Sequence, residues 1–214
     1  MAKLANVPTP AIRRLSLYLR QLETFQESDR STVSSRQLGQ ALGLSDAQVR
    51  KDLAYFGQFG YPGVGYRVAE LIGRVRSILG TDRTVNVLLV GAGNVGRALA
   101  SYRGFLKRGF RLVAVFDNDA AKVGTMTGAP NALPIQPLSD LADTVRTRGV
   151  RLGILAVPSS AAQSVAERMV AAGIRGLLNF APVSLNVDAR VAVSSVDLAV
   201  HLEQLAFQTC PSSG

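Results

Sequence analysis

The sequence predicts an α/β chain in which an N-terminal winged helix-turn-helix domain precedes a Rossmann-like parallel α/β domain. Two capped helices separated by the turn LGLS, residues 42–45, indicate the helix-turn-helix. From Val85 onward, apolar strands alternate with helices, which is typical of a parallel sheet. A G-x-G-x-x-G pattern in residues 91–96 lies between the first of these strands and a helix, as in dinucleotide-binding folds.

Length and composition narrow the class of protein. The chain has 214 residues, 47% of them hydrophobic, which is enough to bury a core. The N-terminus MAKLANVPTP lacks the apolar segment of a signal peptide, and no stretch approaches the ~18 apolar residues of a membrane span. The single cysteine, Cys210, excludes an internal disulfide and fits a reducing compartment. We therefore expect a soluble cytoplasmic protein.

The charge is unevenly distributed. The formal net charge is +9, and residues 1–80 hold 11 Lys and Arg against 6 Asp and Glu. The remaining residues hold 13 against 9, so the excess is denser in the N-terminal part. A basic domain favours polyanionic partners through phosphate contacts and counterion release. The alternative is a basic surface that only faces solvent.

The first helix is predicted to begin at Thr9-Pro10, a capping hydroxyl followed by a proline. Apolar residues then recur at helical spacing and predict one buried stripe, formed by Ile12, Leu15, Leu19, Leu22 and Phe25. Residues 26–32 are a polar connection.

The second and third helices each begin with a capping pattern. Ser34 and Gln37 form a capping box ahead of the second helix, which Gly43 ends. Ser45 and Gln48 repeat the pattern and open a third helix that runs through Phe56.

The third helix has two distinct faces. Its inward face is predicted to contain Val49, Leu53 and Phe56. Its other face places two cations between two small residues, in the order Ala47, Arg50, Lys51 and Ala54. Arginine and lysine can reach phosphates or guanine edges in a groove, while alanines leave room or touch thymine methyls. The alternative is the solvated face of an ordinary three-helix bundle.

A glycine-rich segment follows the third helix. GQFGYPGVGY, residues 57–66, predicts a tight hairpin that would serve as the wing of a winged helix. Residues 67–80 then form an amphipathic helix leading out of the domain. The predicted domains are therefore 1–80 for the DNA-binding head, 81–194 for the Rossmann body, and 195–214 for a closing helix and tail.

The body is predicted to alternate strands and helices. The expected strands are 85–90, 111–116, 152–158, 175–180 and 191–193. The expected helices are 94–107, 139–148, 160–172 and 195–207, and residues 124–137 form a loop.

The glycine pattern has a specific physical reading. Gly91 permits the tight turn, Gly93 lets the backbone approach a pyrophosphate, and Gly96 allows close packing of helix on strand. Asp117 follows Gly96 by 21 residues and would accept hydrogen bonds from ribose hydroxyls. Because Asp117 and Asp119 would repel the 2′-phosphate of NADP, we expect NAD(H). Another nucleotide or coenzyme A remains the alternative.

The body has a predicted ligand but no predicted catalytic residue. The only histidine, His201, lies on the closing helix four residues after Asp197, away from any evident substrate domain. The sequence contains no Cys/His cluster for a metal and no G-x-S-x-G nucleophile elbow. A DNA-reading head joined to a cofactor-binding body without chemistry indicates a sensor rather than an enzyme.

Several segments resemble one known family. SSRQLGQALGLSDAQVRKDLAYFGQFGYPGVGY, VGAGNVGRALASY, AVPSSAAQ, GLLNFAPVSL and SSVDL are similar to the Rex family of redox-sensing transcriptional repressors, from about Pro10 to Phe207. The resemblance implies a homodimer whose C-terminal helix is exchanged between subunits. It also implies a repressor that binds a palindromic operator when NADH is scarce and leaves it when NADH binds.

The resemblance adds roles to individual residues. It implies that Arg50 and Lys51 contact the operator with support from Tyr55, that Tyr102 lies near the nicotinamide, and that Arg20 and Asp197 bridge head and body across the dimer. The predicted DNA-contacting residues are Ala47, Gln48, Arg50, Lys51, Tyr55 and Arg67. The predicted cofactor-contacting residues are Gly91, Ala92, Gly93, Asn94, Val95, Gly96, Tyr102, Asp117, Val157 and Pro158.

Two positions depart from the family pattern. Pro62 stands where close relatives carry a basic residue in the wing, which leaves Arg67 to contact the phosphates. Leu198 stands where some relatives carry phenylalanine, which predicts a weaker insertion near the partner's cofactor. For Arg20 and Asp197, an exposed ion pair of little energetic consequence is the alternative.

In the predicted mechanism, the reduced nicotinamide ring of NADH acts as an effector. Operator half-sites lie ~34–36 Å apart, so a rotation between the two bodies would prevent both heads from binding. An apolar pocket near Ala156, Val157, Pro158 and Phe180 would favour the neutral nicotinamide of NADH over the cationic ring of NAD⁺. Two competing hypotheses are an NAD-dependent oxidoreductase with a basic head and a coenzyme A-binding regulatory module.

Overall fold

The computed structural model describes residues 7–128 and 132–210. The chain divides into two compact units, Met1–Arg83 and Thr84–Gly214, which are described separately below. The sequence had placed this boundary near residues 80–82. Residues 129–131 of the predicted loop and 211–214 of the predicted tail lie outside the described residues.

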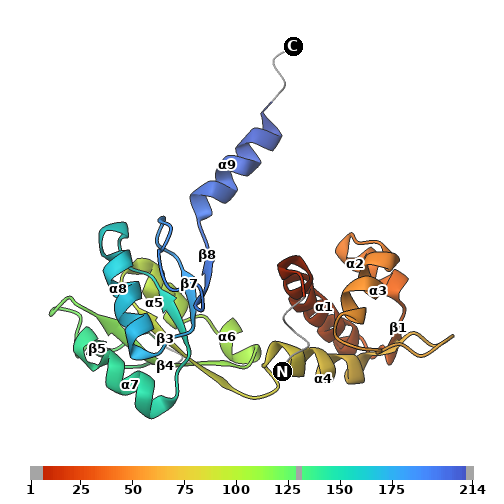
Figure 1. Cartoon of the computed structure of the whole chain (residues 1–214), viewed down its shortest axis with the longest axis horizontal. Coiled ribbons are helices and arrows are strands. Elements are labelled where there is room, and N and C mark those ends of the chain that lie inside the picture. Colours follow the sequence, from red (N-terminus) through yellow and green to blue (C-terminus); the bar gives the residue numbers. More distant parts are fainter. Residues whose placement is uncertain (1–6, 129–131, 211–214) are drawn as a thin grey trace. The chain divides into compact units, whose positions relative to one another are not determined.

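The N-terminal unit is helical with a small two-stranded sheet (Figure 1). Its helices are α1 (Thr9–Glu27), α2 (Ser35–Leu42), α3 (Asp46–Ala54) and α4 (Val68–Leu79). Strand β1 (Thr32–Val33) pairs antiparallel with β2 (Tyr66–Arg67). Strand β1 was not predicted, and its first residue fell in the predicted polar connection, because two residues are too few to give an alternating pattern.

The α1 prediction was correct in its main features and wrong at two residues. The residue preceding the helix is Pro8, and Thr9 lies inside the first turn instead of capping it. Ile12 is 44% exposed, because the neighbouring Ala11 takes its place in the buried stripe. The stripe that packs into the core consists of Ala11, Leu15, Tyr18, Leu19, Leu22 and Phe25.

The helix-turn-helix forms as its capping residues predict. The side chain of Ser34 accepts the backbone N–H of Gln37, and the Gln37 side chain accepts the backbone N–H of Ser34, which completes the capping box. Gly43 ends α2 in the left-handed conformation, with φ of 67°. Ser45 then caps α3 by accepting the backbone N–H of Gln48.

The C-terminal unit contains, within its described residues, a six-stranded parallel sheet. Its strands are β3 (Val85–Val90), β4 (Phe110–Asp117), β5 (Ile135–Pro137), β6 (Leu152–Leu155), β7 (Gly176–Asn179) and β8 (Ala192–Ser195). They are ordered β5-β4-β3-β6-β7-β8, which is the strand order of a dinucleotide-binding Rossmann sheet. Ligands bind such sheets where the order reverses, here between β3 and β6.

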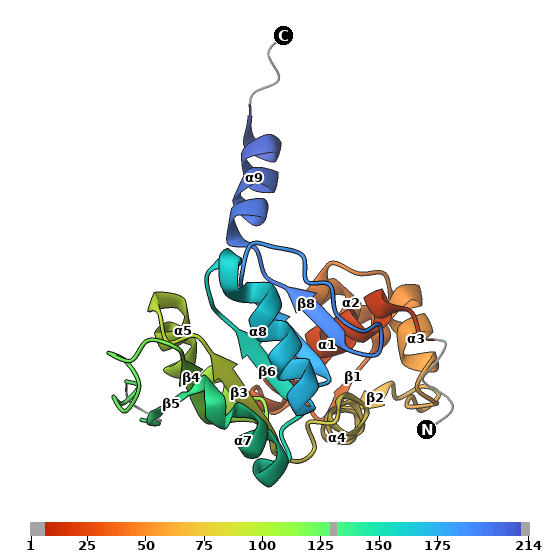
Figure 2. The same cartoon turned by 60° about the vertical axis from the view of Figure 1, so that its left-hand side comes forward.

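Helices cover the sheet on both faces. Leu88 and Val90 of β3 point into a core shared with α7 (Leu141–Arg148) and α8 (Ser159–Ala172), and Figure 2 shows α8 lying over the strands. Val87 and Leu89 point to the other face, with α5 (Asn94–Ala100) and α6 (Gly104–Lys107). Beside α6, this second face has an apolar hollow of about 360 Å³ that extends to β8.

Several predicted elements of this unit differ from the structure, among them the strand predicted at 152–158, which ends at Leu155. The predicted helix 94–107 is interrupted between α5 and α6, and the ring of Tyr102 lies so close to Gly104 that a Cβ there would be 2.3 Å from it. Strand β5 was predicted as loop, because the prolines around it obscure the strand pattern of a sheet edge. Residue 195 belongs to β8 rather than to the closing helix.

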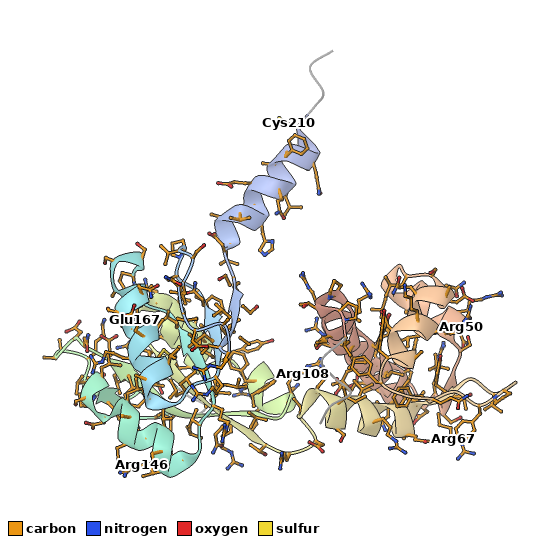
Figure 3. All side chains as sticks on the ribbon, in the orientation of Figure 1. Arg50, Arg67, Arg108, Arg146, Glu167 and Cys210 are labelled. Carbon is orange, nitrogen blue, oxygen red and sulfur yellow. The ribbon has the colours of Figure 1, made fainter. Side chains whose placement is uncertain are left out.

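The closing helix α9 (Leu198–Thr209) is exposed along its whole length. Its large apolar side chains face solvent, with Leu202 at 67% and Phe207 at 86% exposure. Figure 3 shows these side chains, with Cys210 at the end of the helix. A helix with this composition is normally covered by another surface.

Candidate dinucleotide site and nucleic-acid interface

The glycine turn between β3 and α5 depends on the absence of two side chains. Gly91 has φ of +103°, and a Cβ there would lie 2.2 Å from the carbonyl oxygen of Ala156 on the neighbouring β6 segment. A Cβ on Gly96 would lie 1.8 Å from the carbonyl oxygen of Gly91. The first and third glycines therefore allow the turn and the packing of α5 against it.

The second glycine faces open space instead. Apart from Gly93 itself and its chain neighbours, no described atom lies within 4 Å of the position that a Cβ on Gly93 would occupy. Gly93 precedes the first residue of α5, where the free backbone N–H groups of a helix favour an anion. The approach to the turn is therefore open on the side where a pyrophosphate would bind.

A cavity of about 450 Å³ lies at the carboxyl ends of β3, β4 and β6. Five predicted cofactor residues line it, namely Gly91, Gly93, Asp117, Val157 and Pro158. Apolar residues that the sequence reasoning did not name also line it, including Leu138, Ala161 and Val165. Because one part of the wall is apolar and another carries charges, the cavity can bind a ligand with an uncharged ring and a polar sugar.

Tyr102 and Phe180 lie apart from the lining of this cavity. Tyr102 is 57% exposed, packs edge-on against Phe105 with ring centroids 5.0 Å apart, and borders a neighbouring hollow. Phe180 packs among the residues on the α5 face of the sheet. Asn94 and Val95 form the exposed first turn of α5, and Ala92 is buried in the glycine turn.

Asp117 ends β4 and is bonded to the glycine turn. Its Oδ2 accepts the backbone N–H of Ala92 at 2.7 Å, and its Oδ1 accepts the backbone N–H of Asp119 at 2.9 Å. Burial would raise the pKa of Asp117, but these two N–H groups and Lys122 outweigh burial and lower it. The carboxylate therefore stays ionised and able to accept further hydrogen bonds.

Lys122 is a charged group of the cavity that the sequence reasoning missed. Its Nζ lies 3.4 Å from Oδ2 of Asp117 and 3.4 Å from Oδ2 of Asp119. Lys122 follows Asp117 by five residues in a turn, and that spacing alone does not indicate contact. This end of the cavity thus holds two carboxylates and one ammonium, which leaves a local excess of negative charge.

The predicted recognition face of α3 is exposed. Ala47, Arg50, Lys51 and Ala54 face solvent, while Val49 and Leu53 are buried as predicted. The Nη1 of Arg50 donates to Oδ2 of Asp46 at 2.7 Å and to Oγ of Ser35 at 3.0 Å. These bonds hold the guanidinium along the helix surface. Figure 3 labels Arg50 together with Arg67, which belongs to the same unit.

Behind that face lies a polar cluster that was not predicted. Asp52 is fully buried and accepts hydrogen bonds from Arg14 and Tyr18 of α1. Gln48, which the sequence placed among the DNA-contacting residues, directs its side chain to Asp52 at 2.7 Å. Tyr55 lies just after α3 and is 36% exposed.

The hairpin predicted as a wing is present. Tyr61 and Gly65 pair as an antiparallel bridge around Pro62, and β2 continues from it. The guanidinium of Arg67 lies over the Tyr61 ring, 4.9 Å from its centroid. Arg67 is therefore held beside the hairpin that Pro62 turns.

Asp197 has a local structural role that the sequence reasoning did not assign. Its Oδ1 accepts the backbone N–H groups of Ala199 and Val200, so it caps the N-terminus of α9. Arg20 lies on the exposed side of α1. The two residues belong to different units, and their pairing stays a prediction.

Groups for other chemistry are scarce in the described part of the chain. His201 is exposed on α9. No group of three or more His, Cys, Asp or Glu residues suited to a metal ion occurs in residues 7–128 and 132–210. None of the helices described is long and apolar enough to cross a membrane.

Two protein-family models match the chain. One, described as "Putative DNA-binding protein N-terminus", matches residues 6–54. The other, described as "CoA binding domain", matches residues 82–183. The first match lies within the N-terminal unit, and the second lies in the C-terminal unit apart from its first two residues.

Curated relatives match nearly the whole chain. A redox-sensing transcriptional repressor Rex of Carboxydothermus hydrogenoformans is 51% identical over 202 residues, which are 94% of this chain and 96% of that protein. The protein of the same name in Desulforamulus reducens is 49% identical over 205 residues, 96% of each chain.

Solved structures also match nearly the whole chain. A crystal structure of RSP in complex with β-NAD⁺ and operator DNA gives a TM-score of 0.89 at 36% identity, covering 94% of this chain and 92% of that one. RSP in complex with β-NADH gives a TM-score of 0.84 at 34% identity, covering 95% and 94%. RSP is described as a Rex-family repressor.

Proposed function

Because the chain belongs to the Rex family of redox-sensing transcriptional repressors, we propose that it represses transcription according to the NADH/NAD⁺ ratio. It binds a palindromic operator as a homodimer and leaves the operator when NADH binds. The observation that carries this function is the combination, in one chain, of an exposed cationic helix face with a dinucleotide cavity in a separate unit.

In the N-terminal unit, α3 reads the operator. Arg50 and Lys51 contact phosphates or guanine edges, and Ala47 and Ala54 allow the helix backbone to approach the groove. On binding, the Arg50 guanidinium exchanges Asp46 and Ser35 for DNA acceptors, a step that costs little because both hydrogen bonds are exposed to solvent. Tyr55 supports this face, and Arg67 contacts the backbone beside the hairpin.

In the C-terminal unit, NADH occupies the cavity at the ends of the strands. The pyrophosphate lies against Gly93 and the start of α5, and the adenosine ribose binds Asp117. Ala156, Val157 and Pro158 surround the nicotinamide end with an apolar wall. The neutral ring of NADH enters such a wall at a lower desolvation cost than the cationic ring of NAD⁺, so the reduced form is preferred.

The exposed helix α9 and the apolar hollow beside α6 support the dimer. Both are apolar surfaces, and an exchange of α9 between two copies would cover them. Release from DNA then requires that NADH bind a dimer arrangement in which the two α3 helices no longer match the half-site spacing. Such coupling is reciprocal and typically amounts to about 1–3 kcal/mol.

This function requires binding but no reaction. The relatives are named transcriptional repressors, and we propose that this chain also does not catalyse hydride transfer. Because a transcriptional repressor must reach the DNA that it regulates, we place it in the cytoplasm. The match described as a CoA-binding domain keeps coenzyme A as a second candidate ligand for the same cavity.

A thermal-shift titration distinguishes NADH from coenzyme A as the ligand, and a turnover assay tests the enzyme hypothesis. NADH is expected to raise the Tm of the C-terminal unit at lower concentrations than NAD⁺, NADPH or coenzyme A, since stabilisation begins when the ligand concentration exceeds its Kd. A larger shift with coenzyme A would favour the regulatory module. Turnover of NADH with a carbonyl substrate, lost in His201→Ala, would favour an oxidoreductase.

A further inference from the structure

A buried ionised carboxylate lies on the recognition helix itself. Oδ1 of Asp52 accepts from Nη2 of Arg14 at 2.8 Å and from Nε2 of Gln48 at 2.7 Å. Oδ2 accepts from Nε of Arg14 at 2.5 Å and from the hydroxyl of Tyr18 at 2.7 Å. Each oxygen thus receives two donors, which is the number of its lone pairs.

These bonds join two helices in a fixed geometry. Arg14 and Tyr18 lie one turn apart on α1, and Asp52 lies on α3. A bidentate arginine–carboxylate pair has a defined plane and direction, whereas apolar contacts such as those of Val49 and Leu53 allow a helix to rotate or slide. The cluster therefore constrains the rotation of α3 about its own axis.

Asp52 remains charged although it is buried, whereas the Arg14 side chain is 25% exposed. Burial would raise the pKa of Asp52, but the hydrogen bonds from Arg14, Tyr18 and Gln48 outweigh burial and lower it. Well-packed apolar residues in place of a buried ion pair are often as stable or more stable. Stability alone therefore does not explain why this helix carries one.

The position of Asp52 on α3 indicates what the pair does. At 100° per residue, Asp52 points to the opposite side of α3 from Arg50 and Ala54, and those side chains face solvent. A rotation of α3 would move every one of its DNA-facing atoms at once. Base readout depends on hydrogen-bond geometry, whereas attraction to phosphates depends mainly on charge.

We propose that Arg14, Tyr18 and Asp52 are positioning residues that set the rotation of α3 and thereby the discrimination between operator and other DNA. We call this group the Asp52 clamp. The proposal rests on the operator-binding function proposed above. It assigns the clamp to base readout and not to general DNA affinity.

An apolar replacement separates positioning from stability. The triple variant Arg14→Met, Tyr18→Phe, Asp52→Leu removes one positive and one negative charge, so the net charge and the attraction to phosphates stay the same. The probe is the palindromic duplex that the unaltered protein selects from a random pool, compared with a scrambled duplex of equal length, without NADH. Urea unfolding is measured alongside.

We expect the triple variant to remain folded and its preference for the palindrome to fall at least tenfold, while its affinity for the scrambled duplex stays within about twofold. An unchanged preference in the folded variant overturns the proposal. If the triple variant does not fold, Arg14→Lys decides, because it keeps the charge but loses the bidentate fork. A lower preference in folded Arg14→Lys supports the clamp, and an unchanged preference overturns it.

The failure of the proposed function is distinguishable from these outcomes. If the unaltered protein selects no palindrome, the proposal that it binds an operator is wrong. The clamp then has no base readout to support, so both proposals are overturned. If the unaltered protein discriminates and the folded variants discriminate equally, only the clamp is overturned. The matched control is Arg74→Met, which removes an exposed arginine from α4 of the same unit and should leave the preference unchanged.

Discussion

Asp117 and Ala92 are joined by a hydrogen bond of 2.7 Å, in which the backbone N–H of Ala92 donates to Oδ2 of the carboxylate. The bond ties the end of β4 to the glycine turn that follows β3. Asp117 therefore holds the glycine turn and also lines the cavity in which we propose that the dinucleotide binds. A change at Asp117 should affect both parts of the dinucleotide.

Asp117→Ala should weaken NADH binding tenfold or more, because a charged hydrogen-bond acceptor is worth about 1.5–3 kcal/mol. It should also reduce discrimination against NADPH, since one of the two carboxylates facing a 2′-phosphate is gone and Lys122 keeps its charge. Fluorescence titration with NADH and NADPH measures both effects. Asp143→Ala, an exposed carboxylate on α7, is the control. Unchanged selectivity would remove Asp117 from the ribose contact.

The second and third glycines of the turn should respond differently to substitution. Gly93→Ala adds a Cβ that meets no described atom, so the Tm should stay the same while NADH affinity falls. Gly96→Val places carbon within 1.8 Å of the Gly91 carbonyl oxygen and should abolish NADH-driven release without abolishing operator binding. Calorimetry and gel shifts measure these properties. Full NADH affinity in Gly93→Ala would show that the pyrophosphate binds elsewhere.

Lys51→Ala should weaken operator binding and leave NADH affinity unchanged, because Lys51 lies on α3 and the cavity lies in the other unit. Each lost phosphate contact lowers the slope of log K against log salt by roughly 1, so a dimer should lose about 2. Anisotropy titrations over a range of salt concentrations give the slope, with Arg74→Ala as the control. The same slope in Lys51→Ala would argue against a phosphate contact.

Asp197→Asn tests the inferred pairing with Arg20 without removing the helix cap, since asparagine caps as well as aspartate. If the charge of Asp197 stabilises the DNA-bound dimer, operator affinity should fall several-fold while the helix content of α9 is kept. Arg20→Gln should have the same effect, and the double variant should add little to either. Additive effects in this cycle would contradict the pairing.

The Asp52 clamp should make the N-terminal unit sensitive to acid. Since the pKa of Asp52 is below its ordinary value of 3.8 in the folded chain, the unfolded state binds protons first as the pH falls. The stabilisation is therefore present above about pH 4–5 and is lost as the pH falls through the folded-state pKa. Urea unfolding followed by circular dichroism should show a steeper acid loss in the unaltered protein than in the apolar triple variant. An equal loss of stability with falling pH in the two proteins would show that Asp52 does not cause the acid sensitivity.

Features that depend on neighbouring residues were predictable from the sequence. The Ser34 capping box, the glycine turn and strand β3 each follow from a few consecutive residues, and the structure has them where they were expected. Two of the three residues predicted for the inward face of α3, Val49 and Leu53, are buried, because helical periodicity fixes which residues share a side. The third, Phe56, lies beyond the end of α3 at Ala54 and is half-buried.

Features that depend on distant partners were not predictable. Asp52 lies on a helix rich in polar residues, and its burial is determined by Arg14, 38 residues earlier in the chain. Strand β5 exists because β4 offers it an edge to pair with. A single sequence contains no pattern that reports such contacts.

The redox dependence of operator binding tests the account most directly. Anisotropy of a labelled palindromic duplex should be measured with the full-length protein at fixed salt, with NADH, with NAD⁺ and without either. We expect NADH to lower operator affinity about tenfold or more, as a coupling of 1.4 kcal/mol or more would give, and NAD⁺ to leave it nearly unchanged. Equal affinities with the reduced and oxidised dinucleotides would contradict it.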